Sequence, residues 1–241
     1  MTTRHPRPCG RVISLDRGYP LVRVGDEELR AQHAIDLVKN ADARAVVGDI
    51  VDLEFPPTQD IPLITRIHER AHTLVRRSLV ESRSVGSGKH DEQILATNID
   101  VVFVVTSLSG RRLDLDYLER QLVMAHESGA EVCVLLTKAD QAAHRSEDEA
   151  ASRACNPGGS VILTSKITGE GFAQLKELLQ GSGDVLSGSG GALLGRSGAL
   201  QGGDGMLPGR SGVLLGRSGV GKSTLINRLC GSELLQTAAV R

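Results

Sequence analysis

Residues 213–229 read VLLGRSGVGKSTLINRL. Three apolar residues come first, and 225–229 follow with helix-forming character. Between them lies G-x-x-x-x-G-K-[ST], where backbone N–H groups of a glycine turn face an anion and the following helix adds its positive dipole end. A chance match would not add G-K-S-T between a strand and a helix. The stretch therefore predicts a phosphate-binding loop made of Gly216, Arg217, Ser218, Gly219, Val220, Gly221, Lys222, Ser223 and Thr224.

Two side chains of this loop have expected roles. Lys222 would reach the β- and γ-phosphates of a nucleotide, and the hydroxyl of Ser223 would hold Mg²⁺. A protein that uses this loop to bind ATP remains an alternative at this point.

A second motif lies at 135–140, which read LLTKAD at the end of an apolar run. T-K-x-D at a strand end is the guanine-selecting motif of GTPases, because one carboxylate can accept both N1–H and the 2-amino group. Asp140 would specify the base, next to Thr137, Lys138 and Ala139. Alone, the pattern fits a surface lysine and a helix N-cap aspartate equally well. The phosphate loop in the same chain favours the guanine reading.

A third segment, 164–171, reads TSKITGEG after the next apolar run. GTPases place a loop here whose backbone N–H reaches guanine O6, which would make Ser165 and Lys166 part of the base site. An ordinary Ser/Thr turn with a glycine break is the alternative.

Strand-like apolar runs that alternate with helix-like segments define the fold class. Apolar runs at 101–106, 132–136 and 161–164 predict buried strands, separated by helices at 115–128, 141–155 and 172–179. Strands that are apolar throughout and alternate with helices indicate a mostly parallel sheet covered on both faces, an α/β domain. Before them, short strand patterns at 11–15, 20–24, 46–55 and 63–68 predict an all-β barrel of the OB type.

Composition limits the function classes. The 241 residues carry a net charge of −1, so any nucleic-acid surface must be local. The longest apolar runs are strand-sized, far below the ~20 residues that span a bilayer, and the N-terminus lacks a secretory apolar segment. We expect a cytoplasmic protein without a membrane span. Its cysteines, none at metal-ligand spacing, are expected to be reduced structural thiols: Cys9, Cys133, Cys155 and Cys230.

Two segments differ from the rest of the chain. Residues 66–90 hold six basic and two acidic residues and predict a basic connector, with a merely solvated linker as the alternative. Residues 181–221 hold 15 of the 28 glycines, and GRSG occurs at 195–198, 209–212 and 216–219. Only the third copy continues into V-G-K-S, so about 181–212 is expected to be a flexible insertion. A disturbed gene product is the less favoured explanation.

The motifs stand in an unusual order, since Asp140 precedes Gly216 by 76 residues. Ordinary GTPases have the phosphate loop first, so the sheet must be entered at a different point. With the barrel and connector, this order resembles the circularly permuted ribosome-associated GTPases of the RsgA/YjeQ family, as do 96–106 and 118–120. The resemblance runs from about Gly10 to Arg241. It implies an OB-fold RNA-binding domain (1–68), a basic connector (69–95) and a permuted P-loop GTPase domain (96–241).

The resemblance also implies a function. The family's members bind GTP or GDP with Mg²⁺ and hydrolyse GTP during late maturation of the small (30S) ribosomal subunit. Because Tyr19 and Phe55 are the only aromatic residues before Phe103, we expect the barrel to contact rRNA phosphates through Arg and Lys rather than by stacking. We expect a monomer.

Parts of the family's pattern are not found up to Arg241. The switch threonine, the D-x-P-G segment and the zinc-binding C-terminal domain are absent, so we expect a C-terminally truncated GTPase domain. No catalytic residue or zinc ligand is assigned. The alternative function is a catalytically silent module that binds guanine nucleotide and RNA.

Overall fold

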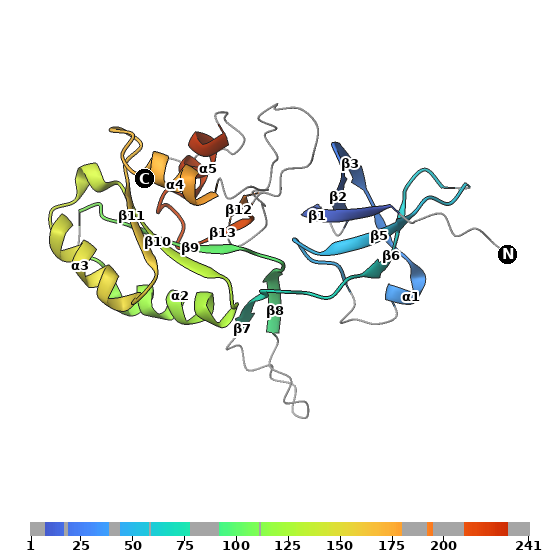
Figure 1. Cartoon of the computed structure of the whole chain (residues 1–241), viewed down its shortest axis with the longest axis horizontal. Coiled ribbons are helices and arrows are strands. Elements are labelled where there is room, and N and C mark those ends of the chain that lie inside the picture. The colour runs from blue at the N-terminus through green and yellow to red at the C-terminus, as the bar shows by residue number, and fades with distance from the viewer. Residues whose placement is uncertain are drawn as a thin grey trace, which may run out of the picture.

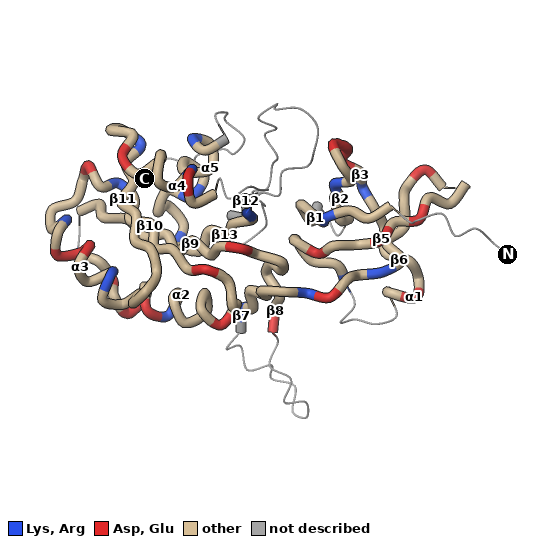
Figure 2. The backbone as a smooth tube through the Cα atoms, viewed as in Figure 1, with Lys and Arg blue, Asp and Glu red and all other residues tan. Residues whose placement is uncertain are grey.

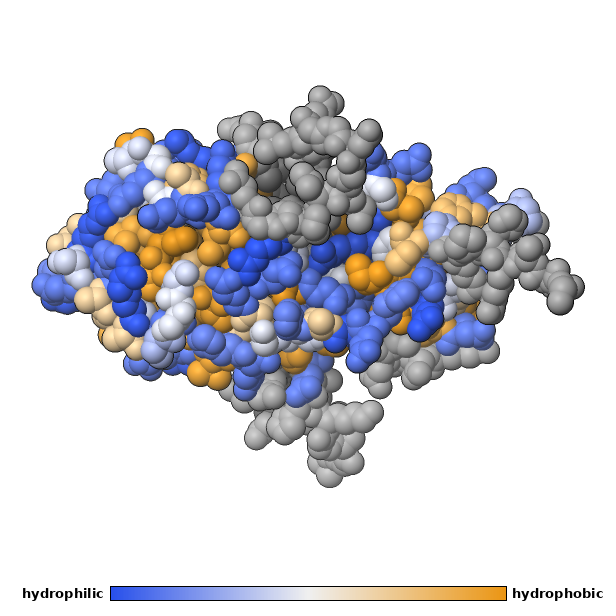
Figure 3. Space-filling model, viewed as in Figure 1, coloured by the Kyte–Doolittle hydropathy of each residue, from blue (hydrophilic) through white to orange (hydrophobic). Residues whose placement is uncertain are grey.

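A computed structural model describes residues 8–16, 19–38, 44–57, 59–77, 92–110, 112–179, 192–194 and 210–230. Figure 1 shows a part made mainly of strands, a second part in which helices flank a sheet, and a two-stranded sheet between them. In the space-filling view, hydrophilic residues cover much of the visible face, and hydrophobic ones gather over the helix-flanked part (Figure 3). None of the helices in these ranges is long and apolar enough to cross a membrane.

The first part is a closed barrel. Its strands are Cys9–Asp16 (β1), Tyr19–Val24 (β2), Glu27–Arg30 (β3), Gln32–His33 (β4), Ile50–Glu54 (β5) and Leu63–Ile67 (β6), with a short helix at Ile35–Val38 (α1). The sheet order is β3-β2-β1-β5-β6-β4. Only Ala31 separates β3 from β4, so the two ends of this order are consecutive in the chain and the sheet closes on itself. This agrees with the predicted OB-type barrel.

Alternating side chains fill the barrel. Successive residues of a strand point to opposite faces, so every second residue of β2 and β5 points inward, as do Gly10 and Val12 of β1 before its register shift. The fully buried interior residues are Val12, Val22, Ala31, Val51, Leu53 and Ile64. The same alternation places Cys9 and Asp52 on the outside.

The second part contains one five-stranded sheet. Its strands are Val101–Ser107 (β9), Glu131–Thr137 (β10), Ser160–Thr164 (β11), Ala192–Leu194 (β12) and Gly212–Leu215 (β13). The order is β11-β10-β9-β13-β12, and the four strands from β11 to β13 are parallel. The last strand among the described residues, β13, thus pairs with the first strand of the sheet, β9, which agrees with a permuted connection.

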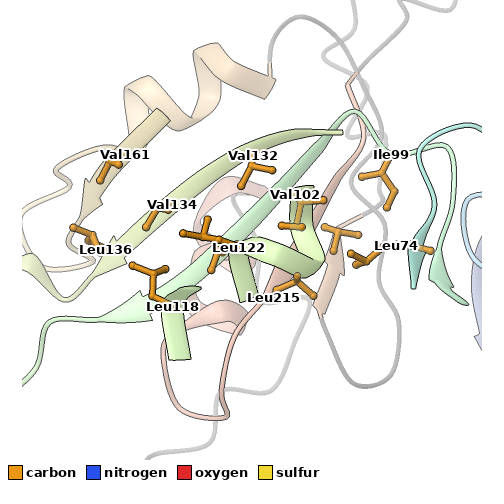
Figure 4. Packing of buried hydrophobic residues seen from close by; sticks show 14 of the residues in the cluster. Leu74, Ile99, Val102, Leu118, Leu122, Val132, Val134, Leu136, Val161 and Leu215 are labelled. Atoms are coloured by element: carbon orange, nitrogen blue, oxygen red, sulfur yellow. The ribbon is translucent and has the colours of Figure 1, made fainter. Parts of the chain in front are cut away.

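Helices cover both faces of this sheet (Figure 1). They are Leu115–Glu127 (α2), Arg145–Cys155 (α3), Phe172–Leu179 (α4) and Lys222–Cys230 (α5). Strand β9 serves both faces: Val102 and Val104 belong to the core under α2, while Phe103 belongs to the core with α4 and α5. Figure 4 shows Leu118 and Leu122 of α2 packed over the sheet in the first of these cores.

A two-stranded sheet lies at the junction of the two parts. Leu74–Arg77 (β7) pairs with Glu92–Ala96 (β8) in antiparallel register. Leu74 and Ala96 are fully buried and belong to the same core as α2 (Figure 4 labels Leu74). The side chain of Asn98 donates to the barrel carbonyl of Gly48 at 2.9 Å. Both ends of the predicted connector therefore form strands that pack against the core with α2.

Asp49 is the polar centre of this junction. Its carboxylate is fully buried and accepts two hydrogen bonds of 2.8 Å from the Arg70 guanidinium. The backbone N–H of Val46 donates to it at 2.8 Å, and the hydroxyl of Thr97 donates at 3.2 Å. Val46 of the barrel, Arg70 of the predicted connector and Thr97, which follows β8, each contribute a donor, so one carboxylate ties three segments together.

Several expectations differ from the structure. Strands β3, β4, β7 and β8 were not expected, because two are very short and two lie in the segment read as a connector. The strand predicted at 46–55 begins at Ile50, since Val47 and Gly48 form a turn. The helix predicted from 141 begins at Arg145, after a 3₁₀ turn at Ala139–Gln141.

The glycine-rich segment also differs from its prediction. Ala192–Leu194 forms edge strand β12 and pairs with β13, where only a flexible insertion was expected. The GRSG copy at 195–198, most of the glycine-rich insertion, residues 78–91 of the predicted connector and residues 231–241 lie outside the described ranges.

We predict that Asp49→Ala lowers the free energy of unfolding by about 3–5 kcal/mol, because the buried Arg70 contact loses its anion. Urea unfolding followed by circular dichroism measures this loss. The matched control is Asp60→Ala, an exposed aspartate, which should change stability by less than about 0.5 kcal/mol. Equal urea midpoints for the two variants would contradict the central role of Asp49.

Candidate functional site

The segment 216–221 forms a tight loop between β13 and α5. Gly219 and Gly221 have φ of +81° and +102°, which side chains other than glycine rarely adopt. A Cβ atom at Gly216 would lie 2.4 Å from the carbonyl oxygen of Val105 in β9. The loop therefore passes so closely over the sheet that only glycine fits there.

Lys222 begins α5 and lies across this loop. Its ammonium group donates to the carbonyls of Gly216 and Arg217, both at 2.8 Å. Partial burial lowers the pKa of Lys222 because desolvation disfavours the charged form. An anion bound next to Lys222 would stabilise its charged ammonium form. Ser223 and Thr224 follow in the first turn of the helix, both half-buried.

Thr137 joins the second motif to this loop. Its hydroxyl lies 2.5 Å from the carbonyl oxygen of Val220 and 3.1 Å from that of Thr106. Thr137 ends β10, two strands away from β13, and 83 residues separate Thr137 from Val220. The two motifs therefore lie side by side at one edge of the sheet.

The next residues of this motif turn sharply after the strand. Lys138 has a left-handed backbone (φ 56°), and its ammonium group is 3.5 Å from the hydroxyl of Ser109. Ala139 is buried, whereas Asp140 is exposed. The turn thus presents the carboxylate of Asp140 to solvent, while the contact of Lys138 and the burial of Ala139 keep the backbone of the turn in place.

Ser165 connects the third segment to Asp140. It is fully buried, and its hydroxyl donates to an Asp140 carboxylate oxygen at 2.5 Å. The same hydroxyl oxygen accepts the N–H groups of Ile167 and Thr168, each at 3.2 Å. Lys166 is exposed, and its carbonyl accepts from Arg228 of α5 at 3.1 Å. The loop after β11 is therefore held against both Asp140 and α5.

The contacts of the Arg217 side chain were not predicted from the sequence. Its guanidinium is 2.9 Å from the carboxylate of Asp114 and 4.0 Å from the ring centre of Tyr117. Asp114 also caps α2 by accepting the Tyr117 N–H at 3.0 Å. This N–H and the Arg217 guanidinium lower the pKa of Asp114. The N-cap pattern was readable locally, but its contact with Arg217 depends on the folded sheet.

The three predicted segments therefore meet. Strands β13, β10 and β11 are parallel to β9, so their carboxyl ends share one edge of the sheet. In open α/β sheets, ligands bind outside this edge. The structure brings together 216–224, 137–140 and 165–166, and the glycine cradle with its helix N-terminus suits a phosphate group.

Comparisons with known proteins point to one family. The family model of the RsgA GTPase matches residues 67–202. The chain is 35% identical over 236 residues to the "Small ribosomal subunit biogenesis GTPase RsgA" of Streptomyces avermitilis, covering 97% of this chain and 54% of that protein. The chain spans about half the length of the curated relatives it matches.

Two solved structures share the fold. YjeQ from Thermotoga maritima matches with a TM-score of 0.60 and 19% identity over 92% of this chain and 65% of its own. YloQ, described as a circularly permuted GTPase, matches with a TM-score of 0.52 and 20% identity over 79% of this chain and 62% of its own. The family match covers more than half of the residues, including the T-K-x-D motif. The chain therefore belongs to the RsgA GTPase family.

Proposed function

We propose that this chain binds GTP and GDP with Mg²⁺ at the carboxyl edge of its parallel sheet and hydrolyses GTP. The contact between Thr137 and the carbonyl of Val220 carries the proposal. It unites a base-selecting motif with a phosphate-binding loop, although the two are far apart in the chain. Membership of the RsgA GTPase family supports the same activity.

In this proposal the loop and Lys222 hold the phosphates. Backbone N–H groups of the glycine turn and the N-terminus of α5 face the anion. Lys222, which lies on the carbonyls of Gly216 and Arg217, would exchange these weak partners for the β- and γ-phosphate oxygens. The hydroxyl of Ser223 would bind Mg²⁺, which supplies charge neutralisation on the phosphates when bound.

Asp140 would select the base. Its exposed carboxylate can accept both donors of a guanine edge, whereas adenine offers no such pair. Ser165 donates to one oxygen of this carboxylate and thereby orients it. The aliphatic part of Lys138 would line the base pocket, and the backbone of Ser165–Lys166 would meet guanine O6.

Hydrolysis by this chain is tested directly. Multiple-turnover GTP hydrolysis in the presence of small ribosomal subunits supports the enzyme, and nucleotide binding without turnover supports the catalytically silent module. We assign no residue to positioning the attacking water.

We further propose that the partner is the small ribosomal subunit and its rRNA, which would place the protein in the cytoplasm, acting as a monomer. Relatives named for small-subunit biogenesis support this partner. Figure 2 shows Lys and Arg positions, with acidic ones among them, along the segment from β6 to β7. Arg66 and Arg76 are exposed there and would contact phosphates.

We predict that Lys222→Ala weakens GTP binding roughly 10- to 150-fold, the equivalent of losing charged hydrogen bonds worth about 1.5–3 kcal/mol. The loss for GDP should be smaller, because the lysine would also reach the γ-phosphate. Titration calorimetry measures both affinities. Lys176→Ala, which removes an exposed lysine of α4, is the control, and equal affinities for the two variants would refute the loop assignment.

Asp140→Asn is expected to reduce GTP affinity by a similar factor of roughly 10–150. The variant should bind xanthosine triphosphate better than the parent does, because an amide can donate to the carbonyl that replaces the 2-amino group. Competition between the two nucleotides measures the change. Asp116→Asn on α2 serves as the control. Unchanged base preference in the Asp140 variant would exclude its role in selection.

Subunit binding should weaken steeply with added salt, because phosphate contacts release counterions. Arg76→Gln is expected to reduce the slope of log affinity against log salt by about 1. Arg153→Gln, on α3, should leave the slope unchanged. Sedimentation with purified small subunits at several salt concentrations measures both. A flat response of the parent chain would remove the phosphate-contact argument.

A further inference from the structure

Three side chains of metal-binding type meet on the outside of the barrel. They are Cys9 of β1, Asp52 of β5 and His68, which directly follows β6; we call them the barrel triad. The sulfur, a carboxylate oxygen and a ring nitrogen all lie within 4.8 Å of one another. The ring Nε2 of His68 is 2.7 Å from Oδ1 of Asp52.

The backbone holds each member of the triad in place. Cys9 and Asp52 are direct partners in the antiparallel β1–β5 ladder, where facing Cβ atoms lie about 4.5–5.5 Å apart. The N–H of Leu53 donates to the carbonyl of Pro8 at 2.9 Å, beside Cys9. The N–H of His68 donates to the carbonyl of Ile50 at 2.9 Å. The three donor groups are thus positioned by adjacent strands of a closed barrel.

The triad is open to solvent. Cys9 is exposed, and the side chains of His68 and Asp52 are 38% and 19% exposed. Their strand neighbours Val51 and Leu53 point into the barrel and are fully buried. An ion could therefore reach all three donors without any change in the core.

The chemistry of the donors selects the ion. A thiolate, an imidazole and a carboxylate form the mixed sulfur, nitrogen and oxygen set that zinc prefers. A thiolate and a carboxylate together carry two negative charges, which balance one divalent cation. We propose that Cys9, Asp52 and His68 form a zinc-binding site on the barrel, completed by a water molecule as the fourth ligand.

The distances suit this ion after small side-chain rotations. Bonds of about 2.0–2.3 Å in a tetrahedron place ligand atoms roughly 3.3–3.8 Å apart. Zinc would replace the direct contact between His68 and Asp52 and draw the sulfur inward by about 1 Å. Mg²⁺ would not compete well, because it requires oxygen ligands in octahedral geometry. The barrel triad and the nucleotide site therefore select different metals.

The site is independent of the proposed GTPase activity. The resemblance placed the family's zinc in a C-terminal domain, whereas this site uses residues 9, 52 and 68 of the barrel. Local spacing could not reveal it, because 43 residues separate Cys9 from Asp52 in the chain. Its test uses metal ions alone, so failure of the zinc site would leave the nucleotide proposal standing.

The experiment is a titration of the full chain, without nucleotide, with Co²⁺ and then Zn²⁺. We expect one Co²⁺ per chain, a sulfur-to-cobalt charge-transfer band, and loss of that band when Zn²⁺ is added. Cys9→Ser should abolish the band. His68→Gln should weaken metal binding at least about 10-fold, because losing even a side chain that only supports a metal ligand typically costs that much affinity. Cys155→Ser, which changes a half-buried thiol on α3, is the matched control and should keep the band.

A second measurement uses only the unaltered chain. Zinc should protect Cys9 from alkylation while the reactivity of Cys155 stays the same, as measured by mass spectrometry of the digested protein. The proposal is overturned if the unaltered chain shows no charge-transfer band, if Cys9→Ser retains it, or if zinc leaves the alkylation of Cys9 unchanged.

Discussion

The parallel register of β13 on β9 is the constraint on which the nucleotide site depends. Leu214 pairs with Phe103 and Leu215 with Val104, so β13 ends three residues before the end of β9, and Gly216 passes over Val105. Because β10 and β11 run in the same direction as β13, the loops that follow these three strands all emerge at the carboxyl edge of the sheet. In this register the hydroxyl of Thr137 lies within hydrogen-bonding distance of the carbonyl of Val220. Motif order along the chain is therefore irrelevant to the site's geometry.

Packing around β9 supports this register from both faces. Val102 and Val104 face the core under α2, while Phe103 faces the core shared with α4 and α5. Arg217 then links the phosphate loop to the beginning of α2 through Asp114 and Tyr117. The loop is consequently attached to the sheet below it and to a helix that precedes it by about 100 residues in the chain.

The junction with the barrel works by a different physical principle. A buried carboxylate is unfavourable unless its lone pairs are satisfied. Asp49 meets this condition because Arg70, Thr97 and the Val46 N–H all donate to it. Hydrogen bonds of this kind depend on direction, so they fix orientation where apolar packing alone would permit sliding. Leu74 and Ala96 add the apolar part of the same contact.

The sequence by itself determined the features that depend on neighbouring residues. These are the glycine cradle with Lys222, the T-K-x-D turn, the buried strands of the parallel sheet and the outline of the barrel, since glycine dihedrals, apolar periodicity and helix capping act over a few residues. Only the tertiary structure decided the pairs that lie far apart in the chain: Ser165 on Asp140, Arg217 on Asp114, β3 and β4 as the closing strands, and the meeting of Cys9, Asp52 and His68. Such pairs depend on the register of the strands and on the packing of a whole domain, and no local pattern of residues encodes them.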